Sequence, residues 1–226
     1  MQVPAAFELS RAPGFRLWRR RGLAGVDADR WRLEGETLLA EAAGEAFDAG
    51  RGFVRRVDLL GRPAVWRVNA HGGLFGRILG RRFLSPDRLE EELTLSETLR
   101  GHGVQTPEVL VALARRSGAC WRQHLVTAEV PGARTVFEAR EQPLALEAAD
   151  ALLEELFRIG LWAPDLHPAN MLWQEEEERC WVIDLADCRL LGRPLTAGEQ
   201  RVRRWRFVRY FRNHDAHMES GPFRWP

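Results

Sequence analysis

Apolar and polar residues alternate in the first half of the chain in a way that predicts an antiparallel sheet. Residues 53–60 alternate, a turn follows at residues 61–63, and residues 64–68 alternate again. An apolar segment, residues 37–47, precedes these runs and leads into a glycine-rich turn. Period-two runs separated by turns are typical of a meander, so we expect three consecutive antiparallel strands here.

The period lengthens after residue 85, where leucines recur at helical spacing up to Gly101. Ser85-Pro86-Asp87 is a typical helix start, so the pattern predicts one helix between these points. Two strand-like runs follow, the first after Pro107 and the second over residues 120–130. The predicted order is therefore three strands, a helix and two strands.

The second half of the chain is predicted to be mostly helical. Residues 145–159 carry an apolar stripe that Gly160 ends, and residues 201–213 form a basic, aromatic segment with helical character. Between them, two short apolar runs flank a charged tip at residues 175–179, which predicts a β-hairpin. This pattern indicates an α+β protein with two lobes.

The change from sheet to helix predicts a lobe boundary near residues 131–138. We expect a sheet-rich N-lobe over residues 37–134 and a small helical C-lobe over residues 135–226. Residues 1–36 are rich in arginine, tryptophan and glycine without a clean period, so we expect an irregular N-terminal arm there.

Charge and cysteine content narrow the possible functions. The 226 residues carry 33 basic and 32 acidic side chains, a net charge of +1, so we expect no nucleic-acid partner. The three cysteines form no C-x-x-C pair, which argues against a disulfide framework or a zinc ribbon. No run has the length and character of a signal peptide or a spanning helix, and we expect a cytoplasmic protein.

Lysine is absent from the sequence, and every basic side chain apart from histidine is arginine. Any mechanism that places a lysine on a phosphate group must therefore use arginine here. This restriction matters because the second half of the chain carries a motif for phosphate chemistry.

The motif is the segment DLHPAN, from Asp165 to Asn170. An apolar strand follows it, and a second apolar strand, after the charged tip, ends at Asp184. A hairpin brings Asn170 and Asp184 together. Phosphoryl transfer needs such a set, because one carboxylate accepts the proton of the attacking hydroxyl while an amide oxygen and a second carboxylate hold Mg²⁺. The alternative is structural: a capping Asp165, a turn-forming Asn170 and a surface Asp184.

The predicted N-lobe offers candidates for binding the nucleotide. Gly50 and Gly52 lie in the turn between the first two strands, where backbone N–H groups can cover phosphates, although a plain hairpin would carry the same glycines. Arg67 lies in the third strand, where kinases carry lysine; the alternative is an outward-facing arginine. Glu92 is our choice as its partner on the helix, with the two preceding glutamates as competitors.

The order of these motifs resembles the lipopolysaccharide kinase family, and within it the 3-deoxy-D-manno-octulosonic acid (Kdo) kinases, of the protein-kinase-like superfamily. The resemblance runs from about Ala49 to Tyr210. Its segments are AGRG (49–52), WRV (66–68), HGGLFGRILGRRFL (71–84), the helix and loop ending in GHGVQTP (92–107), TAEVPGART (127–135), DLHPANMLW (165–173), VIDLADCRL (182–190) and RVRRWRFVRY (201–210).

The resemblance implies a two-lobed, protein-kinase-like fold and ATP-dependent phosphorylation of a sugar hydroxyl on the Kdo–lipid A precursor of lipopolysaccharide. It implies that Asp165 is the catalytic base and that Asn170 and Asp184 bind Mg²⁺. Arg67 and Glu92 would position the phosphates of ATP. The resemblance also implies a peripheral protein at the cytoplasmic face of the inner membrane.

The sequence departs from the family at one position. The histidine expected two residues before the catalytic aspartate is missing, and Ala163-Pro164 stand there. That histidine is mainly a scaffold residue in kinase-like folds, so its loss affects loop geometry and leaves the chemical groups in place. His167, inside the motif, either touches substrate or phosphate or caps the loop.

The acceptor is expected to be a small molecule or a glycolipid. About 42 residues follow Asp184, without the segment from which protein kinases build a protein-substrate groove. Two arginine-rich stripes with large apolar residues, 71–82 and 201–212, could contact an anionic glycolipid or membrane, although the second could be a solvated helix. Two alternatives stay open: a kinase for an aminoglycoside or another sugar, and a non-catalytic pseudokinase.

Overall fold

The computed structural model describes residues 3–46, 53–70 and 80–214. The chain forms two compact units. The first contains residues 1–97 and 108–129, and the second contains residues 98–107 and 130–226. Helices and antiparallel sheet occur in both units, so the predicted α+β class is confirmed.

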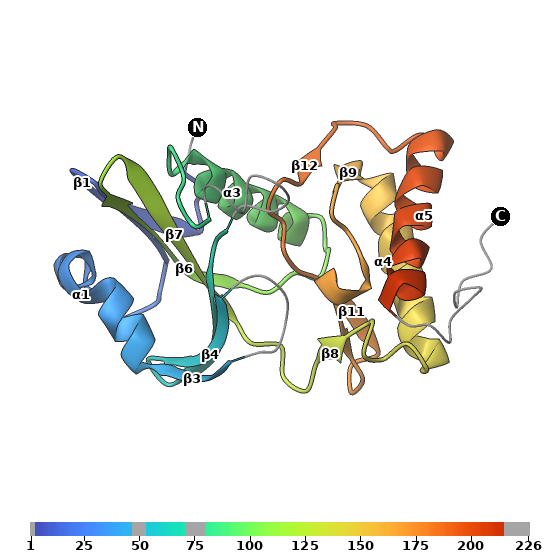
Figure 1. Cartoon of the computed structure of the whole chain (residues 1–226), viewed down its shortest axis with the longest axis horizontal. Coiled ribbons are helices and arrows are strands. Elements are labelled where there is room, and N and C mark those ends of the chain that lie inside the picture. Colours follow the sequence, from blue (N-terminus) through green and yellow to red (C-terminus); the bar gives the residue numbers. More distant parts are fainter. Residues whose placement is uncertain (1–2, 47–52, 71–79, 215–226) are drawn as a thin grey trace. The chain divides into compact units, whose positions relative to one another are not determined.

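The first unit is built on an antiparallel sheet whose described strands follow the order β1-β2-β6-β7-β5-β4-β3 (Figure 1). Along the chain its elements are β1 (Phe7–Ala12), β2 (Phe15–Arg20), α1 (Ala28–Glu41), β3 (Ala43–Ala46), β4 (Phe53–Leu59), β5 (Arg62–Val68), α3 (Asp87–Gly101), β6 (Val109–Ser117) and β7 (Cys120–Ala128). The predicted strands at residues 53–60 and 64–68 and the predicted helix after residue 85 are confirmed as β4, β5 and α3.

Helices cover both faces of this sheet. Leu17 of β2 belongs to the core cluster that contains Trp31 of α1, whereas its neighbour Trp18 belongs to the cluster that contains Leu89 of α3. Successive strand residues point to opposite faces, so α1 and α3 lie on opposite faces of the sheet.

The expectation of irregular structure over residues 1–36 is wrong, because β1, β2 and the first part of α1 lie there. Strand β2 lies between β1 and β6 and buries Phe15, Leu17 and Trp18. A strand that is covered on both faces loses the alternation by which an amphipathic strand is recognised in a sequence.

The segment 37–47 also differs from the expectation of a strand. Helix α1 continues to Glu41, and within the described part of this segment the strand β3 is limited to Ala43–Ala46. The Asp27 carboxylate caps this helix by accepting from the Arg30 backbone N–H at 2.7 Å. Leucine and alanine, which dominate residues 38–43, have high helix propensity and favour continuing the helix.

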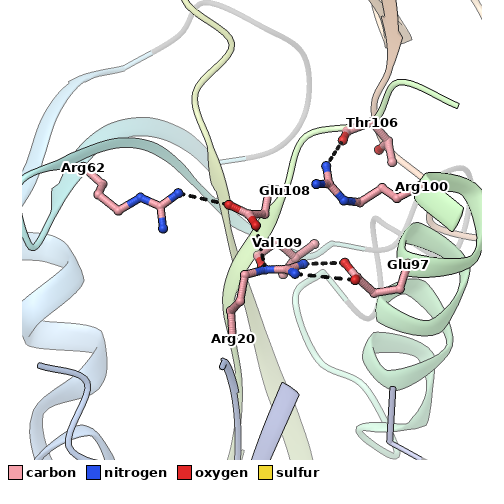
Figure 2. Close-up of polar contacts among 7 residues, drawn as sticks. All are labelled: Arg20, Arg62, Glu97, Arg100, Thr106, Glu108 and Val109. Atoms are coloured by element: carbon pink, nitrogen blue, oxygen red, sulfur yellow. Dashed lines mark hydrogen bonds and ion pairs between the residues drawn. The ribbon is translucent and has the colours of Figure 1, made fainter. Parts of the chain in front are cut away.

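Arg20, at the end of β2, ties three elements of the first unit together (Figure 2). Its guanidinium donates to the Glu97 carboxylate on α3 and to the Val109 carbonyl on β6, and it lies 3.3 Å from the Glu108 carboxylate. Arg62 lies 3.0 Å from the second oxygen of Glu108. This network fixes the end of α3 against the start of β6.

The second unit packs α4 (Pro143–Arg158) and α5 (Ala197–His214) side by side (Figure 1). Arg204 of α5 donates to Asp150 of α4 at 2.7 Å and also to Glu154. The other elements are β8 (Arg134–Thr135), β9 (Leu161–Trp162), the 3₁₀ turn η1 (Pro168–Asn170), β10 (Met171–Gln174), β11 (Arg179–Val182) and β12 (Arg189–Leu190).

The elements predicted for this unit are confirmed. Helix α4 corresponds to the predicted residues 145–159, α5 corresponds to residues 201–213, and β10 and β11 form the predicted hairpin. None of the helices in the described ranges combines the length and apolar character that a membrane crossing requires.

Candidate active site

Two short strand pairs in the second unit place the predicted catalytic loop. Strand β9 ends at Trp162, three residues before Asp165, and pairs with β12. Asn170 precedes β10 directly, and Asp184 follows β11 by two residues. Because β10 and β11 are antiparallel neighbours, Asn170 and Asp184 lie at the same end of the hairpin.

Hydrogen bonds hold these residues close to one another. The Nδ2 atom of Asn170 donates to the backbone carbonyl oxygen of Asp165 at 2.9 Å. The backbone N–H of Ile183, the residue before Asp184, donates to the carbonyl oxygen of Asn170 at 3.0 Å. The structure therefore brings together the three residues that the sequence predicted for proton transfer and metal binding.

The two carboxylates of this cluster are exposed, in contrast to the buried strand residues beside them. Asp184 has a φ angle of +58°, in the left-handed region. This conformation costs a residue with a side chain about 1–2 kcal/mol. Such residues tend to cluster at functional sites, where the surrounding structure holds them in place.

The oxygen atoms of Asn170 and Asp184 fit a Mg²⁺ ion. Asn170 uses its side-chain nitrogen on Asp165, which leaves Oδ1 for a cation, and Asp184 adds a carboxylate. Within the described ranges, no cluster of three or more His, Cys, Asp or Glu side chains could hold a metal. Mg²⁺ is commonly bound by one or two protein oxygens together with substrate phosphates, so this small donor set is adequate.

His167, two residues after Asp165, attaches the loop to α5. Its ring stacks on Tyr210 with centroids 4.4 Å apart, and Tyr210 stacks in turn on His214 at 4.1 Å. Burial lowers the pKa of His167, while the carboxylates of Asp165 and Asp184 act in the opposite direction. Both carboxylates are therefore within electrostatic reach of this ring.

Two arginines of α5, which sequence analysis missed, hold the backbone just before the catalytic aspartate. Arg203 Nη1 donates to the carbonyl oxygens of Ala163 and Pro164, at 3.2 Å each. Arg206 Nη1 donates to the Pro164 carbonyl at 3.0 Å. Arg203 is only 5% exposed, so it is part of the interior of this unit.

In the first unit, Arg67 of β5 donates through Nη2 to the carboxylate of Glu92 on α3. The Glu92 side chain is only 4% exposed. Asn69, which the sequence did not suggest, lies with its Nδ2 atom 3.5 Å from the second carboxylate oxygen of Glu92 and 3.2 Å from the amide oxygen of Gln123. The structure thus gives Arg67 a fixed, buried partner.

The remaining candidates for nucleotide binding, Gly50 and Gly52, lie outside the described residues. Most of the arginine-rich stripe at residues 71–82 lies outside them as well. The candidate residues that the structure describes form two groups: Arg67 and Glu92 in the first unit, and the Asp165 cluster in the second.

Comparison with known proteins identifies relatives. The profile of the Lipopolysaccharide kinase (Kdo/WaaP) family matches residues 54–211. A 3-deoxy-D-manno-octulosonic acid kinase of Vibrio parahaemolyticus is 29% identical over 149 residues, which cover 62% of this chain and 62% of that protein. The protein of the same name from Photobacterium profundum is 26% identical over 173 residues, covering 73% and 70% of the two chains.

A solved structure described as WaaP in complex with acyl carrier protein has a TM-score of 0.59 and 15% sequence identity with this chain. The match covers 92% of this chain and 84% of that one, and it confirms the kinase-like α+β fold. The family match spans the elements from β4 to α5, which include Asp165, Asn170 and Asp184. The chain belongs to the lipopolysaccharide kinase (Kdo/WaaP) family.

Proposed function

We propose that this chain is an ATP-dependent kinase that phosphorylates a sugar hydroxyl of the lipopolysaccharide inner core, with Kdo on a lipid A precursor as the acceptor. The observation that carries the proposal is the hydrogen-bonded cluster of Asp165, Asn170 and Asp184 at the end of one hairpin. The names of the relatives support Kdo as the acceptor.

Asp165 is the base in this proposal. Its exposed carboxylate would accept the proton of the acceptor hydroxyl while the hydroxyl oxygen attacks the γ-phosphorus of ATP and the β–γ bridging oxygen leaves with ADP. The Asn170 side chain fixes the Asp165 carbonyl, and so restricts the backbone that carries the base. A fixed base is expected to help, because most of the catalysis in phosphoryl transfer comes from positioning and electrostatics.

The other residues would hold the nucleotide. Asn170 Oδ1 and the Asp184 carboxylate would bind Mg²⁺, which would neutralise charge on the phosphate oxygens. Arg67 would bind the phosphates, held in place by Glu92, because a planar guanidinium can donate two parallel hydrogen bonds to a phosphate. Arginine would thus serve where lysine is absent. Gly50 and Gly52 are the proposed phosphate-covering turn.

The outer face of α5 would contact the anionic acceptor or the membrane surface that carries it. Trp205 is 54% exposed, and the Arg209 guanidinium lies 5.1 Å from the centre of its ring. Phe207 and Phe211, on the other face of α5, are buried. Tryptophan favours the membrane interface and arginine is attracted to anionic headgroups, so we propose peripheral attachment at the cytoplasmic face of the inner membrane.

The test is phosphate transfer from labelled ATP by the purified protein, with Mg²⁺ and either Kdo–lipid A, free Kdo or an aminoglycoside as acceptor. We expect transfer to Kdo–lipid A that stops with EDTA and with Asp165→Asn or Asp184→Asn. Transfer that survives either substitution would contradict the mechanism. Transfer to the aminoglycoside alone would identify another small-molecule kinase, and ATP binding without transfer to any acceptor would indicate a pseudokinase.

A further inference from the structure

We propose that Arg203 is a positioning residue that holds the catalytic loop in the shape that Asp165 requires, taking over the role of the histidine that this chain lacks. The inference rests on the proposed function, since it requires Asp165 to be the base. It comes from the contacts of Arg203 with three consecutive residues, 162–164, directly before Asp165.

These contacts surround the guanidinium of Arg203. Its Cζ atom lies 4.2 Å from the centre of the Trp162 ring, and its Nη1 atom donates to the Ala163 and Pro164 carbonyl oxygens. Hydrogen bonds from a charged donor are roughly twice as strong as neutral ones. Pro164 also restricts Ala163 to extended conformations. One side chain of α5 therefore fixes the direction in which the backbone enters Asp165.

The burial of Arg203 argues against a purely stabilising role. Among the described residues Arg203 forms no salt bridge, and its Nε atom has no hydrogen-bond partner. Burial lowers the pKa of Arg203, and the positive charge of Arg206 adds to this. Burying a cation without a carboxylate is costly, and an apolar side chain would fill the same space at lower cost. Such departures from good packing are expected where function requires them.

Arg204, the next residue of α5, provides a comparison, because its contacts are those of an arginine with a structural role. It is also sheltered from water, but it pairs with Asp150 and Glu154 of α4 and lies over the Phe157 ring. These two ion pairs join α4 to α5. The two neighbouring arginines therefore form a matched pair for an experiment.

The experiment compares Arg203→Ala, Arg203→Lys and Arg204→Ala in the full chain, with kcat and KM for ATP measured on Kdo–lipid A and the unfolding temperature measured by circular dichroism. We expect Arg203→Ala to lower kcat about 100-fold, the effect of misplacing a catalytic group by about 1 Å, with little change in KM. Arg203→Lys, which keeps the charge and some donors, should recover part of kcat. Arg204→Ala should lower the unfolding temperature and leave kcat unchanged.

The outcomes separate the two proposals. Inactive wild-type protein, or activity that survives Asp165→Asn, would overturn the proposed function and with it the reason for testing Arg203. Active wild-type protein with equal kcat in Arg203→Ala and Arg204→Ala would overturn only the positioning role. If Arg203→Ala fails to fold, Arg203→Lys decides, because a wild-type kcat at an unchanged unfolding temperature would show that the guanidinium is not needed.

Discussion

Arg67 of β5 is paired with Glu92 of α3, and the glutamate is almost completely buried. If this pair holds ATP, Glu92→Gln should raise KM for ATP about tenfold, equivalent to about 1.4 kcal/mol of binding. Arg67→Lys should have a similar effect, because lysine lacks the planar fork that binds two phosphate oxygens. Steady-state kinetics with varied ATP measures both. Glu91→Gln, at an exposed neighbouring position, is the control, and equal kinetics for Glu91→Gln and Glu92→Gln would contradict the role.

Gly160 ends α4 and leads directly into β9, with a φ angle of +80°. An added Cβ atom would lie 1.9 Å from the Arg193 carbonyl oxygen. We expect Gly160→Ala to reduce the free energy of unfolding by about 2–5 kcal/mol, from backbone strain and overpacking together. Urea unfolding measures the loss.

Gly192→Ala is the matched control for this change. Gly192 has a φ angle of +69°, but an added Cβ atom would meet no heavy atom within 4 Å. Only the conformational cost of about 1–2 kcal/mol is expected. Equal losses in the two variants would show that the close approach at Gly160 carries no penalty of its own.

Arg20 is the centre of the network in Figure 2, and its side chain is only 14% exposed. Arg20→Ala would leave the Glu97 and Glu108 carboxylates without their shared partner, and we expect a loss of about 1–3 kcal/mol in the free energy of unfolding. Arg62→Ala removes a 47% exposed partner of Glu108 and should cost less than about 1 kcal/mol. Chemical denaturation compares them, and a larger loss for Arg62→Ala would refute this ranking.

Glu199 in the first turn of α5 is expected to make the stability of the protein sensitive to acid. Hydrogen bonds from Arg193, and then from the Thr196 backbone and hydroxyl, lower the pKa of Glu199 from 4.5 to about 2. A carboxylate whose pKa is lower in the folded than in the unfolded state stabilises the protein at pH values above its unfolded-state pKa. This contribution to stability is lost as the pH falls toward the folded-state pKa. The unfolding temperatures of wild type and Glu199→Gln should therefore differ above pH 4.5 and converge toward pH 2. A difference that is independent of pH would contradict the assignment.

The exposed face of α5 provides a test of membrane attachment. Sedimentation with vesicles that contain anionic phosphatidylglycerol should capture the wild type, and Arg209→Ala should weaken binding about fivefold, since one arginine near an anionic surface contributes about 1 kcal/mol. Trp205→Ala should also weaken binding. Leu144→Ala, which removes an exposed apolar side chain of α4, is the control. Equal binding to neutral vesicles would exclude an electrostatic attachment.

The elements that could be predicted from the sequence are those with one buried face. Strands β4 and β5 alternate, and α4 buries a stripe that includes Leu152, Leu153 and Leu156. The Asp165 cluster could also be predicted from the sequence, because its residues are close in the chain and joined by one hairpin. Local patterns of this kind depend little on the rest of the fold.

The elements that were missed depend on distant parts of the chain. Strand β2 is covered on both faces, which removes the alternation of apolar and polar residues. Helix α1 extends into the segment that was expected to form a strand, because its alanines and leucines favour a helix. Arg203 lies 40 residues from the carbonyl of Ala163, so only the folded unit connects them. Its position four residues before Phe207 and eight before Phe211 was the available signal, because these three residues form the buried face of α5.

Residues 98–107 belong to the second unit, although in the sequence they lie between the two segments of the first unit. In this stretch, Arg100 donates to the Thr106 carbonyl at 2.9 Å (Figure 2), and the Gln105 carbonyl accepts from the backbone N–H of Val182, two residues before Asp184. A fragment that begins at residue 130 would therefore lack a partner of the strand that leads to the proposed metal ligand. A single cut of the chain therefore cannot separate the residues of the two units.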